Sequence, residues 1–170
     1  MFGLTPLGIV HTAVGLVALI CGVWTLARDK EISTRNTLGQ TYLAATLVTA
    51  LTALGIFQHG GFGPPHMLAI FTLAALAVGT VAALTNLFGR WSRYLQAIGY
   101  STTMLFHIIP GFTEALTRLP PGQPVLPSAD APAFGPIYGT LFLVFLVGLV
   151  LQLRWLRGGV RAQQMVPGKQ

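Results

Sequence analysis

The sequence predicts an all-α integral membrane protein with five transmembrane helices, on three observations. The 170-residue chain is 53% hydrophobic and has a mean hydropathy of +0.68. Only 8% of its residues are charged, whereas a soluble domain carries about 25%, so the chain cannot cover itself with a water-compatible surface. Its apolar residues also gather in runs of about 20, the length that a helix needs to cross a bilayer.

Five apolar runs follow one another within a single transmembrane domain, residues 1–170. The expected helices are 6–27, 38–58, 66–88, 93–112 and 137–156. The first run is too long for a cleaved signal peptide and no basic residue precedes it, so we expect it to stay as a helix.

Charges, glycines and prolines mark the ends of the runs. The charged residues 28–31 close the first run, and the Gly- and Pro-rich turn 60–65 separates the second from the third. Pro110 lies in the last turns of the fourth. Prolines and glycines also predict an outer loop over 113–136, and residues 162–170 are expected to form a polar tail.

Short connections such as the turn 60–65 favour antiparallel neighbours. We therefore expect the first four helices to form an antiparallel four-helix bundle, with the fifth helix peripheral to it.

The basic residues predict the orientation, because five spans place the two termini on opposite sides. Every Lys and Arg except Arg118 falls on one side, and the positive-inside rule makes that side cytoplasmic. The N-terminus is then outside and the C-terminus inside a bacterial inner membrane. The net charge of +6 thus indicates orientation in a lipid bilayer and predicts no nucleic-acid partner. The three tryptophans, Trp24, Trp91 and Trp155, fall at inner helix ends, as in an interfacial aromatic belt.

All four histidines fall in the outer halves of the expected helices, and each belongs to a different helix: His11, His59, His66 and His107. An imidazole inside a membrane span is costly and usually faces the bundle interior or water. Histidine is also the commonest metal ligand and a carrier of protons near neutral pH.

Helical spacing indicates which way two of these histidines face. Small residues at spacings of three and four share a stripe with the first histidine: Gly8, His11, Gly15, Ala18 and Gly22. Polar residues form a similar stripe on the fourth helix: Gln96, Tyr100, Thr103, His107 and Glu114. Both stripes are expected to face other helices.

Simpler explanations exist for the same residues. Ordinary interhelical hydrogen bonds explain the polar stripe equally well, and Glu114 could pair with Arg118 four residues later. His59 lies where an interfacial imidazole is comfortable. The threonines of the second helix, at 41, 46, 49 and 52, can bond their own backbone and need no function.

Three interpretations of the outer histidines compete, and none includes a catalytic residue. His11 and His107 could clamp a haem b, with the small residues of the first helix making room for it. Alternatively, His11, His66 and His107 could bind zinc or copper, completed by water or Glu114. Either site would link the protein to envelope redox chemistry, with Tyr100, Thr103 and Glu114 around the ligands. The third interpretation is a cofactor-free accessory or assembly subunit of a larger respiratory or photosynthetic membrane complex, docked through its outer loop.

Several short motifs also resemble a known family, the uncharacterised prokaryotic membrane proteins grouped as domain of unknown function 2306. The resemblance runs from His11 to about Arg118, on these motifs: His11-Thr-Ala-Val-Gly15, Arg35 with Gly39 and Tyr42, Phe62-Gly-Pro-Pro-His-Met-Leu-Ala69, and Tyr100-Ser101. The family typically has a His-Arg pair before the second helix and a histidine between the third and fourth. Here Thr34-Arg35 and Arg93-Tyr94 stand in those places. The resemblance implies a multi-helix inner-membrane protein without inner-side histidine ligands, and it implies no activity.

Overall fold

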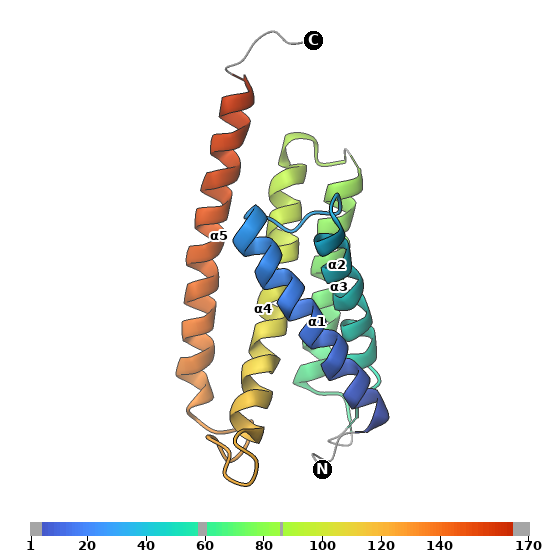
Figure 1. Cartoon of the computed structure of the whole chain (residues 1–170), viewed down its shortest axis with the longest axis vertical. Helices are drawn as coiled ribbons and strands as arrows, with labels where there is room; N and C mark the ends of the chain where they lie inside the picture. The colour runs from blue at the N-terminus through green and yellow to red at the C-terminus, as the bar shows by residue number, and fades with distance from the viewer. Residues whose placement is uncertain (1–4, 58–60, 86, 165–170) are drawn as a thin grey trace.

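The computed structural model describes residues 5–57, 61–85 and 87–164, and this part of the chain contains helices and no strand (Figure 1). The helices are α1 (Pro6–Asp29), α2 (Thr37–Ala53), α3 (Pro64–Leu84), α4 (Ser92–Arg118) and α5 (Phe134–Gln164), with a 3-10 turn, η1 (Gly89–Trp91), before α4. The prediction of an all-α chain with five helices is confirmed.

Local sequence signals set the starts of the first two helices. The Thr5 hydroxyl accepts a hydrogen bond from the Gly8 amide at 3.1 Å, and Pro6 opens α1. Asn36 caps α2 through the Gly39 amide at 2.8 Å. Such side-chain acceptors satisfy amides that have no partner inside the helix.

Several helix ends differ from the sequence prediction, and α3 runs over Pro64–Leu84 rather than 66–88. α2 ends at Ala53 rather than near residue 58, because the Gly55 amide turns back to the Thr52 carbonyl at 3.0 Å. α4 continues through Pro110 to Arg118 rather than ending at 112. Proline removes one helical hydrogen bond, but the following turns are held by Thr113, whose hydroxyl donates to the Ile109 carbonyl at 2.9 Å.

The end of α4 and the start of α5 shorten the expected outer loop to residues 119–133. The Leu126 amide bonds to the Leu116 carbonyl at 2.9 Å, so this loop folds back on α4. α5 begins at Phe134 instead of 137 and extends to Gln164, into the region expected to be a polar tail from 162. Residues 165–170 lie outside the described part of the chain.

The helices run up and down, with each packed beside the next in sequence, and α5 stands apart beside α4 (Figure 1). The most extensive contacts join α1 to α2 and α3 to α4. The packing is close enough that two tyrosines lie against glycines. A Cβ atom on Gly22 would lie 2.8 Å from the Tyr42 ring, and one on Gly79 would lie 2.7 Å from the Tyr100 ring.

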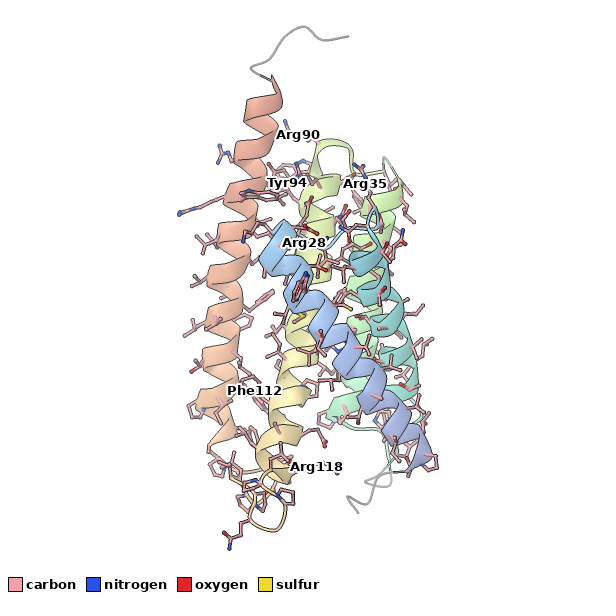
Figure 2. All side chains as sticks on the ribbon, in the orientation of Figure 1. Arg28, Arg35, Arg90, Tyr94, Phe112 and Arg118 are labelled. Atoms are coloured by element: carbon pink, nitrogen blue, oxygen red, sulfur yellow. The ribbon has the colours of Figure 1, made fainter. Side chains whose placement is uncertain are left out.

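The charges separate to opposite ends of the bundle. Figure 2 shows Arg28, Arg35 and Arg90 at one end, which we call the cationic end, and Arg118 at the other. α5 reaches past the other helices at the cationic end, and the loop 119–133 lies at the opposite end (Figure 1).

Two polar contacts attach α5 to the bundle. Near the cationic end, the buried Gln152 amide accepts from the Ser101 hydroxyl and donates to the Lys30 carbonyl, each at 2.8 Å. Near the other end, the hydroxyls of Thr113 and Tyr138 lie 2.7 Å apart. Between these contacts most side chains of α5 are apolar and exposed, and the exposed Arg154 and Arg157 follow toward the cationic end.

Three of the helices, α1, α3 and α5, are long and apolar enough to cross a membrane. α2 has 17 residues, and α4 carries the polar stripe. The chain therefore has the character of a membrane protein, with lipid as the natural cover for its exposed apolar surface.

Candidate functional site

His11 lies on α1 with its ring half-buried against α2. Its Nδ1 atom lies 3.1 Å from both the Thr49 carbonyl oxygen and the Thr52 hydroxyl. A carbonyl oxygen only accepts, so Nδ1 carries the ring proton and donates it. The other nitrogen, Nε2, therefore keeps its lone pair when the ring is neutral.

His107 lies on α4 and is buried in the bundle. Its Nε2 atom is 3.0 Å from the hydroxyl of Thr46 on α2. Its ring meets that of Tyr42 edge-on, with the centroids 6.1 Å apart. His11 and His107, which we call the histidine pair, thus both bond to α2.

One face of α2 supplies all these contacts through Tyr42, Thr46, Thr49 and Thr52, at spacings of four, three and three. Thr49 and Thr52 also donate to carbonyls one turn earlier, each at 2.8 Å. Sequence reasoning accounted for those backbone bonds and missed the bonds to histidine. The spacing shared with Tyr42 was the available signal for them.

Thr103 and Tyr100 contact this cluster through Tyr42 and not through the histidines. The Thr103 hydroxyl donates to the Tyr100 carbonyl at 2.7 Å, so the Tyr42 hydroxyl, 2.6 Å away, donates to Thr103. The Tyr100 hydroxyl instead donates to Thr80 on α3 at 3.2 Å. From Gln96 to His107 the polar stripe of α4 therefore faces the bundle interior, as its spacing indicates, whereas Glu114 lies on the surface.

Glu114 pairs with Arg118 on the surface of α4, and its side chain is 55% exposed. This contact confirms the ion pair that the spacing of four residues indicated.

His66 occupies a separate position at the start of α3. It is 4% exposed and its ring lies between those of Phe57 and Phe62, with centroids 4.6 and 5.1 Å away. Its Nδ1 atom accepts from the Gly63 amide at 3.2 Å. The proton of the neutral ring is then on Nε2, which is buried without a hydrogen-bond partner.

The structure does not gather the predicted three-histidine ligand set. Within the ranges described, no group of three or more His, Cys, Asp or Glu side chains is placed to hold a metal ion. The protonated Nε2 of His66 could become a ligand only if the ring gave up its bond to Gly63. His59 lies outside the described residues.

The small residues of α1 do not leave room for a haem. A Cβ atom on Gly22 would lie 2.7 Å from the Met104 sulfur, and one on Gly15 would lie 3.4 Å from the Thr49 methyl group. Side chains of α2 and α4 therefore fill the space beside these glycines, and a macrocycle does not fit this packing.

Comparisons with known proteins add no relative to this description. No family model, no curated protein and no solved structure matches the chain. The resemblance to domain of unknown function 2306 therefore stays a prediction from short motifs.

Proposed function

We propose that the chain is a multi-pass protein of the bacterial inner membrane whose outer half holds a zinc or copper site at the histidine pair. The membrane part rests on α1, α3 and α5, which are apolar enough to span. In the proposal α2 and α4 also cross, because they pack lengthwise between the apolar helices (Figure 1). The cationic end faces the cytoplasm, as the positive-inside rule favours.

The hydrogen bond from His11 Nδ1 to the Thr49 carbonyl carries the metal proposal. Metal-binding histidines usually donate their second ring nitrogen to a carbonyl or carboxylate, which orients the ring and makes the ligating nitrogen more basic. The same bond here leaves Nε2 of His11 with its lone pair available.

His107 and Glu114 are the donors that the proposal adds to His11. In the structure these three side chains are not placed together to hold an ion, so both donors must move to bind one. Zinc accepts two imidazoles, a carboxylate and a water in tetrahedral geometry, and imidazole also suits copper. Binding would require His107 to exchange its Thr46 bond for the ion, and Glu114 to turn away from Arg118. A copper ion at this position would take part in redox chemistry on the outer side of the membrane.

Metal analysis of the purified protein tests the proposal. We expect stoichiometric zinc or copper in the native chain and its loss in His11→Ala and in His107→Ala. Thr52→Val removes one partner of His11 and should lower the metal affinity about 10- to 100-fold, the usual effect of losing such a partner.

His66→Gln is the matched control, because glutamine at the third helical position also caps a helix start. It should keep the metal. A native protein without metal after reconstitution, or variants of His11 and His107 that retain it, would contradict the proposal. A Soret band in the absorption spectrum would show that the protein binds a haem rather than a zinc or copper ion, and would contradict the proposal.

The surface of α5 favours a second candidate, a cofactor-free accessory subunit of a larger membrane complex. Only 6% of its apolar span is buried in the chain, so a partner helix has room to pack there. Co-purification of other membrane subunits with a metal-free protein would support this candidate.

A further inference from the structure

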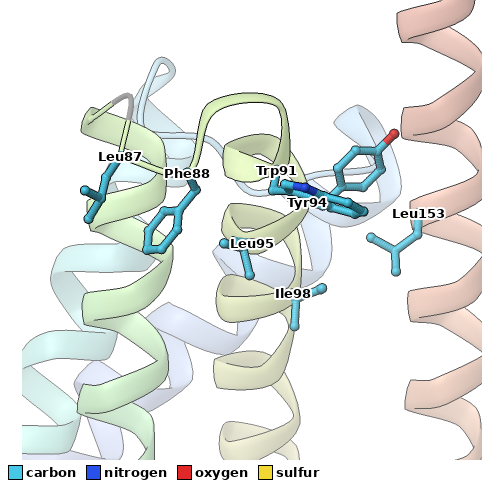
Figure 3. Close-up of a pocket in the computed structure, with 7 residues that line it drawn as sticks. All are labelled: Leu87, Phe88, Trp91, Tyr94, Leu95, Ile98 and Leu153. Carbon is cyan, nitrogen blue, oxygen red and sulfur yellow. The ribbon is translucent and has the colours of Figure 1, made fainter.

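An apolar groove at the cationic end has the composition of a lipid site. It has a volume of about 430 Å³ and lies between the link after α3, the start of α4 and α5 (Figure 3). Its lining consists of Leu87, Phe88, Trp91, Tyr94, Leu95, Ile98 and Leu153. Trp91 and Leu87 are 58% and 74% exposed, so the groove opens outward rather than into the bundle.

The aromatic side chains place the groove at the membrane boundary. Trp and Tyr concentrate where hydrocarbon meets headgroups, and Trp91 and Tyr94 form the part of the lining beside η1 (Figure 3). Ile98 lies farther along α4, toward the middle of the bundle. The groove therefore runs from the headgroup level into the hydrocarbon, along the direction of an acyl chain.

Two arginines stand at the headgroup end of this groove. Arg90 precedes the lining residue Trp91, and its guanidinium lies 5.4 Å from the centre of that indole ring. Arg157 lies four residues after the lining residue Leu153, and therefore on the same face of α5 one turn nearer the cationic end. Both side chains are exposed.

The described acidic groups at this end are already engaged. Asp29 pairs with Arg28 at 2.7 Å, and Glu31 pairs with Arg93 at 3.3 Å. Within the described residues, no carboxylate pairs with Arg90 or Arg157. These two exposed arginines are therefore available to an anion from outside the chain.

We propose that this groove binds an anionic phospholipid, with one acyl chain along Leu95 and Ile98 and the phosphate between Arg90 and Arg157. Lipid fits both halves of the site, because a single molecule carries the apolar chain and the negative charge. The proposal requires that the chain lie in a membrane. The orientation proposed above decides only which leaflet supplies the lipid, and it places the groove in the cytoplasmic leaflet.

Native mass spectrometry of the full chain, released from mixed micelles of phosphatidylglycerol and phosphatidylcholine, tests the proposal. The native protein should retain phosphatidylglycerol in preference to phosphatidylcholine. Arg90→Gln and Arg157→Gln should each weaken that preference about fivefold, the effect of one basic residue at an anionic membrane surface. Ile98→Trp should fill the groove and reduce the retention of both lipids.

Arg35→Gln is the matched control, because it removes one exposed arginine of the cationic end that lies outside the groove. It should leave the preference unchanged, and free glycerol phosphate should not compete. An equal loss of the phosphatidylglycerol preference in Arg35→Gln would show that the arginines act only through general charge attraction, and it would overturn the proposal. Three other results would also overturn the proposal. They are the absence of a lipid preference in the native protein, competition by glycerol phosphate, and a dimer that Ile98→Trp abolishes. None of these readouts depends on orientation or on metal, so the lipid site can fail without the proposed function failing.

Discussion

Each buried histidine of the pair has a threonine of α2 as a partner, so its ring is held in place by another helix. Thr46 lies 3.0 Å from His107 Nε2, and Thr52 lies 3.1 Å from His11 Nδ1. In a membrane the cost of burying a ring nitrogen is lowest when a neighbouring helix supplies the partner. The threonines therefore set the positions of both rings as well as the packing of α2.

Thr46→Val tests whether the Thr46 hydroxyl stabilises the fold through its bond to His107. The substitution keeps the shape of the side chain and leaves Nε2 of His107 without its partner, so we expect a loss of about 0.6–1.7 kcal/mol in the free energy of unfolding, the range for such bonds between membrane helices. Thr41→Val is the control, because Thr41 is exposed on the same helix, and it should change little. Reversible unfolding in mixed detergent micelles measures both, and equal effects would contradict the role of the Thr46 hydroxyl.

The sequence predicts that His11 and His107 face the bundle better than it predicts the residues that they contact, for a physical reason. His11 and His107 stand on stripes whose spacing of three and four requires an inward face, and both do face the bundle. Thr46 carries a weaker signal, the spacing that it shares with Tyr42, because a threonine that bonds its own backbone and one that bonds another helix have the same local sequence. The sequence also does not predict that His66 lies apart from the histidine pair, because the position of its ring depends on its contacts with Phe57 and Phe62.

At the scale of the helices, hydropathy predicts number and order, and tertiary contacts decide the ends. Pro110 is a strong local reason to end α4, yet the helix continues to Arg118 with Thr113 bonded to Tyr138 of α5. α2 stops early at a local turn, where the Gly55 amide bonds to the Thr52 carbonyl. For α4 a contact with another helix accompanies the continuation past proline, and such a contact cannot be predicted from one run of residues.

Helix packing gives a second prediction, at the contact of α3 with α4. A Cβ atom on Gly79 would lie 2.7 Å from the Tyr100 ring, so Gly79→Ala should separate the two helices and cost about 1–3 kcal/mol, as overpacking does in other cores. Gly148→Ala is the matched control. Gly148 lies within α5 with no atom near its Cβ position, and alanine there should be neutral or stabilise the helix by up to about 1 kcal/mol. The same unfolding measurement compares them, and a neutral Gly79→Ala would show that α3 and α4 are not so closely packed.

At the scale of the whole molecule, the arrangement of charge has consequences that can be measured directly in the membrane. Ten basic residues offset by four acidic ones give the chain its charge of +6, and Figure 2 shows Arg28, Arg35 and Arg90 together at one end. Moving such a cluster across a bilayer is costly, so the cationic end should remain where the chain is inserted. The histidine pair and the proposed lipid groove then lie toward opposite faces of the membrane.

Single cysteines in a Cys21→Ala background test this orientation and also the number of spans. Five crossings place the links before α2 and after α3 inside, and the links before α3 and after α4 outside. Thr37→Cys and Thr85→Cys should therefore react with a membrane-impermeant maleimide only after lysis, whereas Gly61→Cys and Ser128→Cys should react in intact spheroplasts. All four native residues are exposed in the structure, so burial in the protein does not prevent labelling. The reverse labelling pattern would show that the protein has the opposite orientation, with the histidine pair in the cytoplasmic half of the membrane. Labelling of residues 37 and 61 from the same side would show that α2, the shortest of the five helices, does not cross the membrane.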